Sequence, residues 1–166
     1  MKKTILFPTD FTIESLHVVK SALLQLKDQE TCDIILLHGI HPGDSITELL
    51  FYSRSKMLEA LHNPEFDEAC TVIRNKFASR ILSLRKDVFT GITQAAFNQY
   101  LDACKADEIC IPASYSLRLT SRKSFDLIPF IKKSRITVHE IPGSPKSSAR
   151  EKGSLAELFL NPLPGS

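Results

Sequence analysis

The chain has 166 residues, of which 43% are hydrophobic and 24% charged, as in an average soluble globular protein. This length fits one domain and can bury about two-thirds of the surface that the unfolded chain exposes, so the core needs no disulfide or metal. The net charge of +2 excludes a broadly basic nucleic-acid-binding protein. No apolar run approaches the roughly 20 residues of a membrane span, and no signal peptide is recognisable, so we expect a cytoplasmic protein.

Strand-like and helix-like stretches alternate along the chain. Short apolar runs, bounded by Pro, Gly or polar residues, predict strands at 4–7, 33–38, 86–89, 108–111 and 136–141. Apolar residues at helical spacing predict helices over 12–29, over 46–61 with or without a break, and over 65–83, 92–103 and 124–133. This order predicts an α/β fold: an open five-stranded parallel sheet with helices on both faces. Ligands of such folds bind beyond the carboxyl ends of the strands, which draws attention to the loops after the first, second and fourth strands.

The composition changes after the last predicted strand. We expect an α/β domain over 1–141, a flexible linker over 142–153 and a short apolar tail over 154–166. In the tail, Ser154 and Glu157 have the spacing of a helix capping box, and Leu158 and Phe159 follow. One or two helical turns are not stable alone, so this segment either frays or docks as an apolar anchor on this subunit or another chain.

The cysteine and histidine patterns favour no metal site. The histidines His38 and His41 follow an apolar run, but no partner ligand motif accompanies them. The cysteines show no CxxC spacing and lie in apolar or periodic stretches, which favours small buried thiols in a reducing compartment. They are Cys32, Cys70, Cys104 and Cys110.

The opening of the chain resembles that of universal stress protein domains. Residues 3–12 read KTILFPTDFT, and these domains usually open with a hydrophobic strand followed by Pro-Thr-Asp and Phe-Ser or a close variant. The resemblance extends over about 1–141, through the second strand ending in His38, Gly91 before a helix and the strand at 108–111. It implies a Rossmann-like fold of the adenine nucleotide alpha hydrolase kind, a role in the stress response, and a homodimer that pairs through the last strand.

ATP-binding members of this family share a glycine-rich loop after the fourth strand, Gly-x-x-Gly, nine residues, then Gly-Ser or Gly-Thr. Glycines there let backbone amides approach the phosphates and adopt positive φ. In this chain Ala113, Ser116 and Lys123 take the places of the glycines, the loop is about three residues shorter, and Ser124 alone matches. The resemblance therefore implies a member that does not use the family's way of binding ATP.

The same loop begins a basic stretch, which leaves a second reading open. Between Ile111 and Arg135 the chain has six basic residues and one acidic residue, Asp126. A Ser- and Arg-rich loop could hold a nucleotide or another anion through its side chains; a solvated basic loop is the alternative. The candidate ligand-binding residues are Asp10, Ser114, Ser116, Arg118, Arg122, Lys123 and Ser124.

Asp10 has two interpretations of equal weight. It matches the family's aspartate at the end of the first strand, which lies near the nucleotide in members that bind ATP. Asp10 and Thr12 also lie where the first helix needs an N-cap.

No catalytic signature is present, since the sequence lacks a G-x-S-x-G elbow, a Walker loop and H-E-x-x-H. We therefore expect a non-enzymatic stress-response protein that acts as a dimer or through protein partners without ATP, although weak phosphohydrolase activity is not excluded. The alternative is a nucleotide- or anion-binding regulatory module, with ATP or another adenine nucleotide as the ligand. We expect neither a nucleic-acid nor a membrane partner, and the tail offers a surface for a protein partner. The candidate dimer contacts are Ile136, Val138, Leu158 and Phe159.

Overall fold

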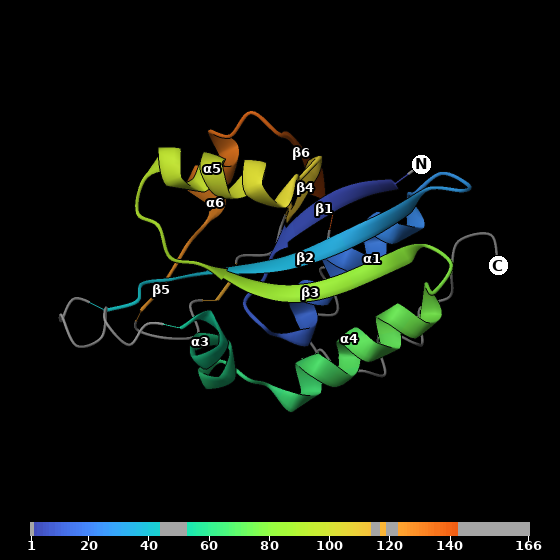
Figure 1. Cartoon of the computed structure of the whole chain (residues 1–166). Coiled ribbons are helices and arrows are strands. Elements are labelled where there is room, and N and C mark those ends of the chain that lie inside the picture. Colours follow the sequence, from blue (N-terminus) through green and yellow to red (C-terminus); the bar gives the residue numbers. More distant parts are fainter. Residues whose placement is uncertain (1, 44–52, 114–116, 119–122, 143–166) are drawn as a thin grey trace.

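Five parallel strands form the centre of the molecule in the order β3-β2-β1-β4-β6 (Figure 1). The computed structural model describes residues 2–43, 53–113, 117–118 and 123–142. The predicted open parallel sheet is confirmed, and its strand order reverses between β1 and β4. The strands are β1 (Lys2–Pro8), β2 (Thr31–Ile40), β3 (Ile81–Phe89), β4 (Glu108–Pro112) and β6 (Thr137–Ile141).

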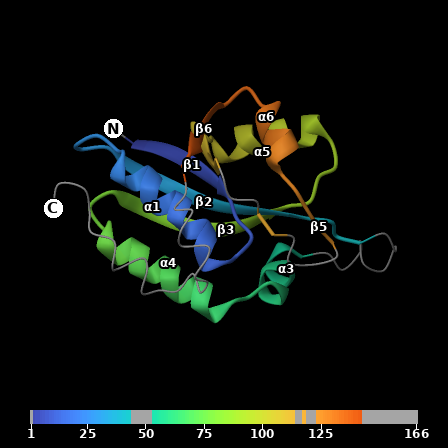
Figure 2. The same ribbon diagram turned by 180° about the vertical axis from the view of Figure 1, so that it is seen from behind.

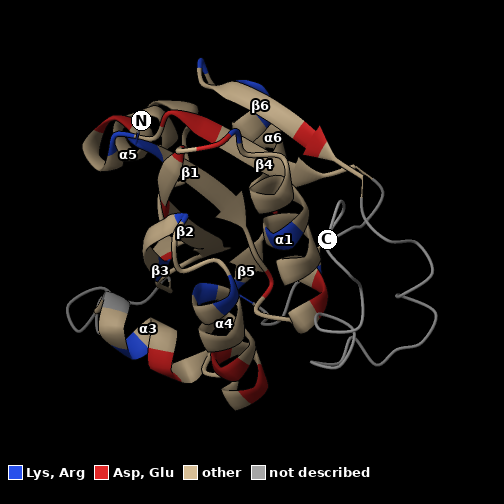
Figure 3. Ribbon diagram, turned by 90° about the vertical axis from the view of Figure 1, so that its right-hand side faces the viewer, with Lys and Arg blue, Asp and Glu red and all other residues tan. Residues whose placement is uncertain are grey.

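The helices cover both faces of the sheet (Figures 1 and 2). Right-handed crossovers place helices on one face while the chain moves from β1 to β3, and on the other face while it returns from β3 to β4 and moves on to β6. The first face carries α1 (Leu16–Leu24) and α4 (Pro64–Lys76), and the second carries α5 (Gln94–Cys104) and α6 (Ile128–Lys132). The short α3 (Arg54–Ala60) precedes α4. Charges favour α4, because Glu65 and Asp67 lie in its first turn and Arg74 and Lys76 in its last, as Figure 3 shows by colour.

Each face of the sheet has its own apolar core because successive strand residues point to opposite sides. In β1, Ile5 and Phe7 belong to the cluster under α1 and α4, whereas Leu6 belongs to the cluster under α5. The fully buried rings Phe66 of α4 and Phe97 of α5 occupy the two clusters. The sheet is therefore held from both sides, and its carboxyl edge is left to the loops.

Two predicted helices were too long. The helix predicted over 12–29 is a short 3-10 turn, η1 (Ile13–Ser15), followed by α1, which ends at Leu24. The helix predicted over 65–83 ends at Lys76, and Ile81 already lies in β3, which the sequence placed at 86–89. The Arg80 guanidinium donates to the carbonyls of Leu26 and Lys27, both at 3.2 Å, and fixes the turn that separates α4 from β3.

The helix predicted over 124–133 was wrong at its start. Ser124 and Phe125 form a two-residue strand, β5, that pairs antiparallel with Ile40 and Gly39 of β2, and α6 begins only at Ile128. Long-range pairing with β2 therefore overrides the local helical pattern.

Several sequence predictions lie outside the described residues. These are the linker beyond residue 142, the tail with Leu158 and Phe159, and part of the helix predicted over 46–61. Among the described cysteines, Cys32, Cys70 and Cys110 are buried and Cys104 is half-buried, and none is in a disulfide. No helix in the described part of the chain is both long and apolar enough to cross a membrane.

Candidate functional site

The candidate site lies at the carboxyl edge of the sheet, where the order of the strands reverses. Three segments meet there: the turn after β1, the end of β2, and the loop that leads from β4 to β5. Polar groups from these segments form a hydrogen-bonded network. Its buried members are Thr9, Asp10, Ser15, His38 and Ser124.

His38 joins the turn after β1 to β5. Its Nδ1 lies 2.8 Å from the Thr9 carbonyl oxygen, and its Nε2 lies 2.7 Å from the Ser124 hydroxyl oxygen. Because a carbonyl only accepts, Nδ1 carries the proton, and Nε2 of the neutral ring accepts from Ser124. Burial lowers the pKa of His38, although the Thr9 carbonyl and the charge of Asp10 oppose this shift. The imidazole is therefore neutral at pH 7, in the tautomer that this pair of bonds requires.

The turn after β1 is closed by its own hydroxyl groups. Thr12 is the N-cap of η1, and its side-chain oxygen accepts from the Ser15 amide. The Ser15 hydroxyl donates to the Thr12 carbonyl at 2.8 Å, so the Thr9 hydroxyl, also 2.8 Å away, donates to Ser15. The Thr9 hydroxyl oxygen in turn accepts from the Phe11 amide at 3.0 Å. Thr12 rather than Asp10 therefore caps the first helical turn.

Asp10 ties the turn after β1 to the loop after β4. Its carboxylate is almost fully buried, with 1% of the residue exposed. One carboxylate oxygen accepts from the amide and hydroxyl of Thr12, and the other accepts from the Arg118 amide at 2.8 Å. The Arg118 guanidinium lies 3.6 Å from the carboxylate of Glu14, so this loop is held at two points. Asp10 thus supports the N-cap residue Thr12. It also binds the backbone amide of Arg118, near the position where the family resemblance places a nucleotide.

Phe11 takes a strained backbone conformation at the centre of this turn. Its φ is 60°, in the left-handed region, which costs an ordinary residue about 1–2 kcal/mol. The Asn63 side-chain amide donates to the Phe11 carbonyl at 2.9 Å, and the ring packs against His38 and Phe66, with centroid distances of 5.1 and 5.4 Å. These contacts hold the strained turn in place and keep its amides aimed at the network.

The space left in the crevice is small. Between Pro8, His38, Arg118 and Asp126 lies a cavity of about 10 Å³, which holds about one water molecule. Pockets for small ligands usually measure about 300–1,000 Å³. The cavity between these described residues is therefore much smaller than a usual ligand pocket.

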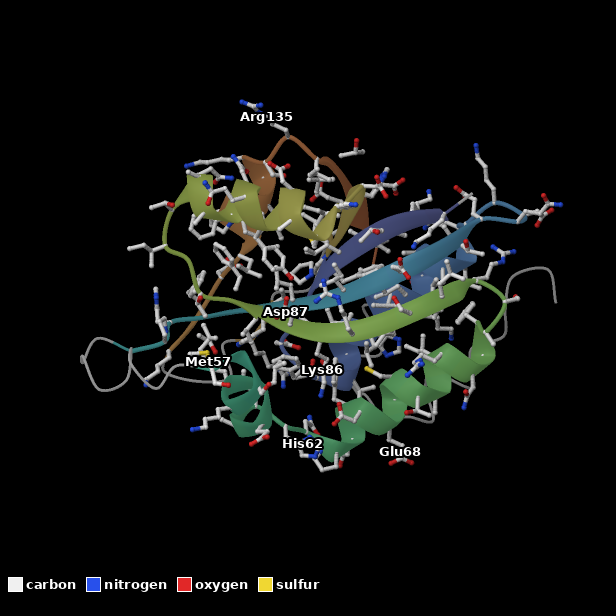
Figure 4. All side chains as sticks on the ribbon, viewed as in Figure 1. Met57, His62, Glu68, Lys86, Asp87 and Arg135 are labelled. Carbon is white, nitrogen blue, oxygen red and sulfur yellow. The ribbon has the colours of Figure 1, made fainter. Side chains whose placement is uncertain are left out.

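The structure brings together three of the residues predicted to bind a ligand. Asp10, Arg118 and Ser124 border the crevice, but Asp10 bonds to the Arg118 amide and Ser124 to His38. Lys123 is exposed next to β5, and its carbonyl accepts from the His41 amide at 2.8 Å. Arg135, part of the basic stretch, points outward from the far end of the molecule (Figure 4). Ser114, Ser116 and Arg122 lie outside the described residues.

Sequence reasoning missed the pairing of His38 with Ser124, which are 86 residues apart. The pair has the hydrogen bond that links a base to a nucleophile in serine enzymes, and the Thr9 carbonyl orients the ring. Only 3% of His38 and 8% of Ser124 is exposed, however, so the hydroxyl is covered. The hydrogen bond between Ser124 and His38 therefore helps to hold β5 against β2. Elsewhere, within the described ranges, no group of three or more His, Cys, Asp or Glu side chains is placed to hold a metal ion.

Comparisons with known proteins bear on the fold of the chain. No protein-family model and no curated protein matches the sequence. Among solved structures, the crystal structure of the hypothetical protein PH0823 aligns with a TM-score of 0.51 and 21% identity, covering 85% of this chain and 96% of that one. A protein from the universal stress protein family of Burkholderia pseudomallei also aligns with a TM-score of 0.51, at 12% identity, covering 85% of this chain and 96% of its own.

The chain has the universal stress protein fold. The loop after β4 lacks the glycine-rich pattern, and two of its described residues instead form backbone hydrogen bonds to neighbouring segments. Ala113 donates its amide to the Ile141 carbonyl of β6 at 2.9 Å, and further along the loop the Arg118 amide reaches Asp10. The loop thus bonds to β6 at Ala113 and to the turn after β1 at Arg118.

Proposed function

We propose that this chain is a non-enzymatic universal stress protein that acts in the stress response, as a dimer or through protein partners, without bound ATP. One observation carries the proposal: the Asp10 carboxylate accepts the Arg118 amide in a crevice with room for about one water molecule. A nucleotide would have to break this bond and displace Arg118. The four thiols without a disulfide also favour a reducing compartment such as the cytoplasm.

The first prediction concerns the ligand. We expect mass spectrometry of the denatured protein to release no nucleotide, and calorimetric titration with ATP and magnesium at millimolar concentration to give no binding heat. The physical reason is that the crevice is closed by Asp10, Arg118, His38 and Ser124, which are bonded in pairs.

Binding of ATP would instead favour the nucleotide- or anion-binding module. In that case Arg118→Ala should abolish the binding heat, because this guanidinium borders the crevice. The matched control is Arg135→Ala, which removes an equal charge from a side chain that points away (Figure 4).

The proposed dimer pairs two copies through β6, which is the last strand of the sheet order. Ile136 and Val138 are half-buried against the apolar cluster under α5, so the strand's backbone rather than these side chains faces the edge. The Ile141 carbonyl accepts from Ala113 beside β4, and backbone groups alternate along a strand. The amides and carbonyls of Val138 and Glu140 therefore point outward, where a second copy could pair with them.

The second prediction tests this edge with Glu140→Pro. Proline removes an outward amide, and edge strands tolerate it. A symmetric dimer would lose two hydrogen bonds, each contributing about 0.5–1.5 kcal/mol, so the dissociation constant should rise about tenfold or more. Sedimentation over a concentration series measures this change. Glu140→Ala, which keeps the amide, should leave the dimer unchanged. A wild-type chain that stays monomeric, or equal effects of both variants, would contradict pairing through β6.

Leu158 and Phe159 are proposed as further contacts of the tail with a protein surface.

The proposal of a non-enzymatic function is supported by the burial of the Ser124 hydroxyl, which keeps this potential nucleophile away from a substrate.

A further inference from the structure

The edge strand β6 fixes how two copies of the chain can pair, if they pair as proposed above; the inference made here rests on that dimer. β6 is the last strand of the sheet (Figure 3). Within β6, Val138 and Glu140 turn their amide and carbonyl groups outward, because Ile141 bonds toward β4. In an antiparallel pair, residues with outward groups lie directly opposite each other. Val138 opposite Glu140 of the second copy uses both residues of each strand, whereas any other register within β6 uses only one.

This register places His139 at the twofold axis of the dimer. His139 lies between the two outward residues, so it faces His139 of the second copy at a non-hydrogen-bonded position. Residues that lie directly opposite share one face of the sheet, with Cβ atoms about 4.5–5.5 Å apart. The two imidazole rings therefore stand beside each other on the face that carries α1. The His139 side chain is 46% exposed and borders a hollow of about 250 Å³, so water and a small ion can reach the rings.

The carboxylate of Glu108 leaves one nitrogen of His139 open for a ligand. The Nε2 atom lies 3.2 Å from the Oε1 atom of Glu108. Because a carboxylate only accepts, Nε2 carries the proton of the neutral ring, and Nδ1 keeps its lone pair. A histidine that binds a metal usually has its other ring nitrogen against a carboxylate or carbonyl in this way. Nδ1 is also the nitrogen next to Cβ, and a Zn–N bond is about 2.0–2.1 Å, so two neighbouring rings can direct their Nδ1 atoms at one ion.

The charges next to His139 favour a cation. The Lys3 ammonium lies 3.0 Å from both the Glu30 and the Glu108 carboxylates, so two carboxylates share one ammonium. Each copy therefore brings an excess negative charge to this face of the sheet. The exposed Lys27, on the turn after α1, is screened by water. A divalent cation between the two neutral rings would balance the excess charge of both copies.

We propose that the dimer binds one divalent ion of the zinc kind on its twofold axis, through Nδ1 of His139 from each copy, with water as the remaining ligands. Imidazole is a preferred ligand of zinc, and the hollow beside His139 has room for the water molecules. The site is incomplete in a single copy, which supplies only one of the two rings. Zinc therefore binds the dimer more tightly than the monomer and shifts the equilibrium toward the dimer.

Sedimentation over a concentration series, without metal and with zinc chloride, tests the proposal. At about 0.1 mM zinc the dissociation constant of the wild-type dimer should fall about tenfold or more, and calorimetric titration should show one ion for two chains. His139→Gln should remove the response to zinc and leave the metal-free dimer unchanged. The matched control is His62→Gln, which alters a histidine that is 54% exposed and 2.9 Å from the Asp67 carboxylate, and it should keep the response.

Cysteine substitution tests the register without metal. Opposite residues at a non-hydrogen-bonded position have Cα atoms about 4.5 Å apart, within the range of a disulfide, so His139→Cys should give a cross-linked dimer on oxidation. Glu140→Cys should not, because in this register the two substituted residues are about 8 Å apart, beyond the reach of a disulfide. The wild-type chain, which has four free thiols of its own, is the blank.

Two results would overturn the proposal while leaving the dimer in place. One is a dimer that Glu140→Pro weakens but zinc does not strengthen, and the other is a response to zinc that survives His139→Gln. Cross-linking through Glu140→Cys but not through His139→Cys would place another residue on the axis and overturn the register. A chain that stays monomeric with and without zinc would contradict the proposed dimer itself, and the metal site with it.

Discussion

Asp10→Ala is expected to lower the free energy of unfolding by about 3 kcal/mol or more, because hydrogen bonds to a charged group contribute about 1.5–3 kcal/mol each. The substitution leaves the amides of Thr12 and Arg118 and the Thr12 hydroxyl without their acceptor. Denaturant titration followed by circular dichroism measures the change. Hydrogen exchange should also rise at Arg118, because its amide loses the carboxylate that fixes the loop after β4.

Two further variants sharpen this prediction. Asp10→Asn keeps one carbonyl oxygen, which can accept from Thr12 or from Arg118 but not from both, so we expect a loss of about 1–2 kcal/mol. Asp28→Ala is the control: its side chain is fully exposed, 3.7 Å from Arg80, and should change stability by no more than about 0.5 kcal/mol. A loss for Asp10→Ala as small as that of Asp28→Ala would show that the bond to Arg118 does not hold the loop.

The parallel sheet could be predicted from the sequence because buried strands appear as short apolar runs. Residues 34–37, Ile-Ile-Leu-Leu, are buried on both faces of the sheet, so the run is uninterrupted and the strand is recognised. The beginning of β3 was missed for the opposite reason. It is an edge strand, and Leu82, Ser83 and Arg85 are exposed, so the apolar run that predicts a strand starts only later.

The closure of the site could not be predicted, because it depends on contacts between distant segments. Asp10 and Arg118 are 108 residues apart, and neither has a neighbour in sequence that indicates the other. The family resemblance singled out Asp10 and Ser124 as candidate ligand contacts. The sequence did not indicate that the Arg118 amide would bind Asp10, or that the His38 ring would bind Ser124.

Gly39 offers the sharpest test of how β5 closes the crevice. Gly39→Ala is expected to lower the free energy of unfolding by about 1–3 kcal/mol, the usual cost of overpacking. A Cβ atom at this position would lie 2.8 Å from the Phe125 carbonyl oxygen, 2.9 Å from the Phe125 ring and 3.0 Å from Leu127. Because a backbone carbonyl cannot rotate away, β5 must shift, and the bond between Ser124 and His38 should break with it. Denaturant titration measures the loss, and hydrogen exchange over 124–132 should report the released segment.

A second substitution separates the two causes of this effect. Phe125→Ala in the Gly39→Ala background removes the ring but leaves the carbonyl oxygen 2.8 Å from the added carbon. If the backbone contact displaces β5, the double variant should stay as exposed to exchange as the single one. Recovery of protection in the double variant would instead assign the clash to the ring. In that case β5 could pack against β2 with a side chain at position 39, and the hydrogen bond between Ser124 and His38 would not require glycine there.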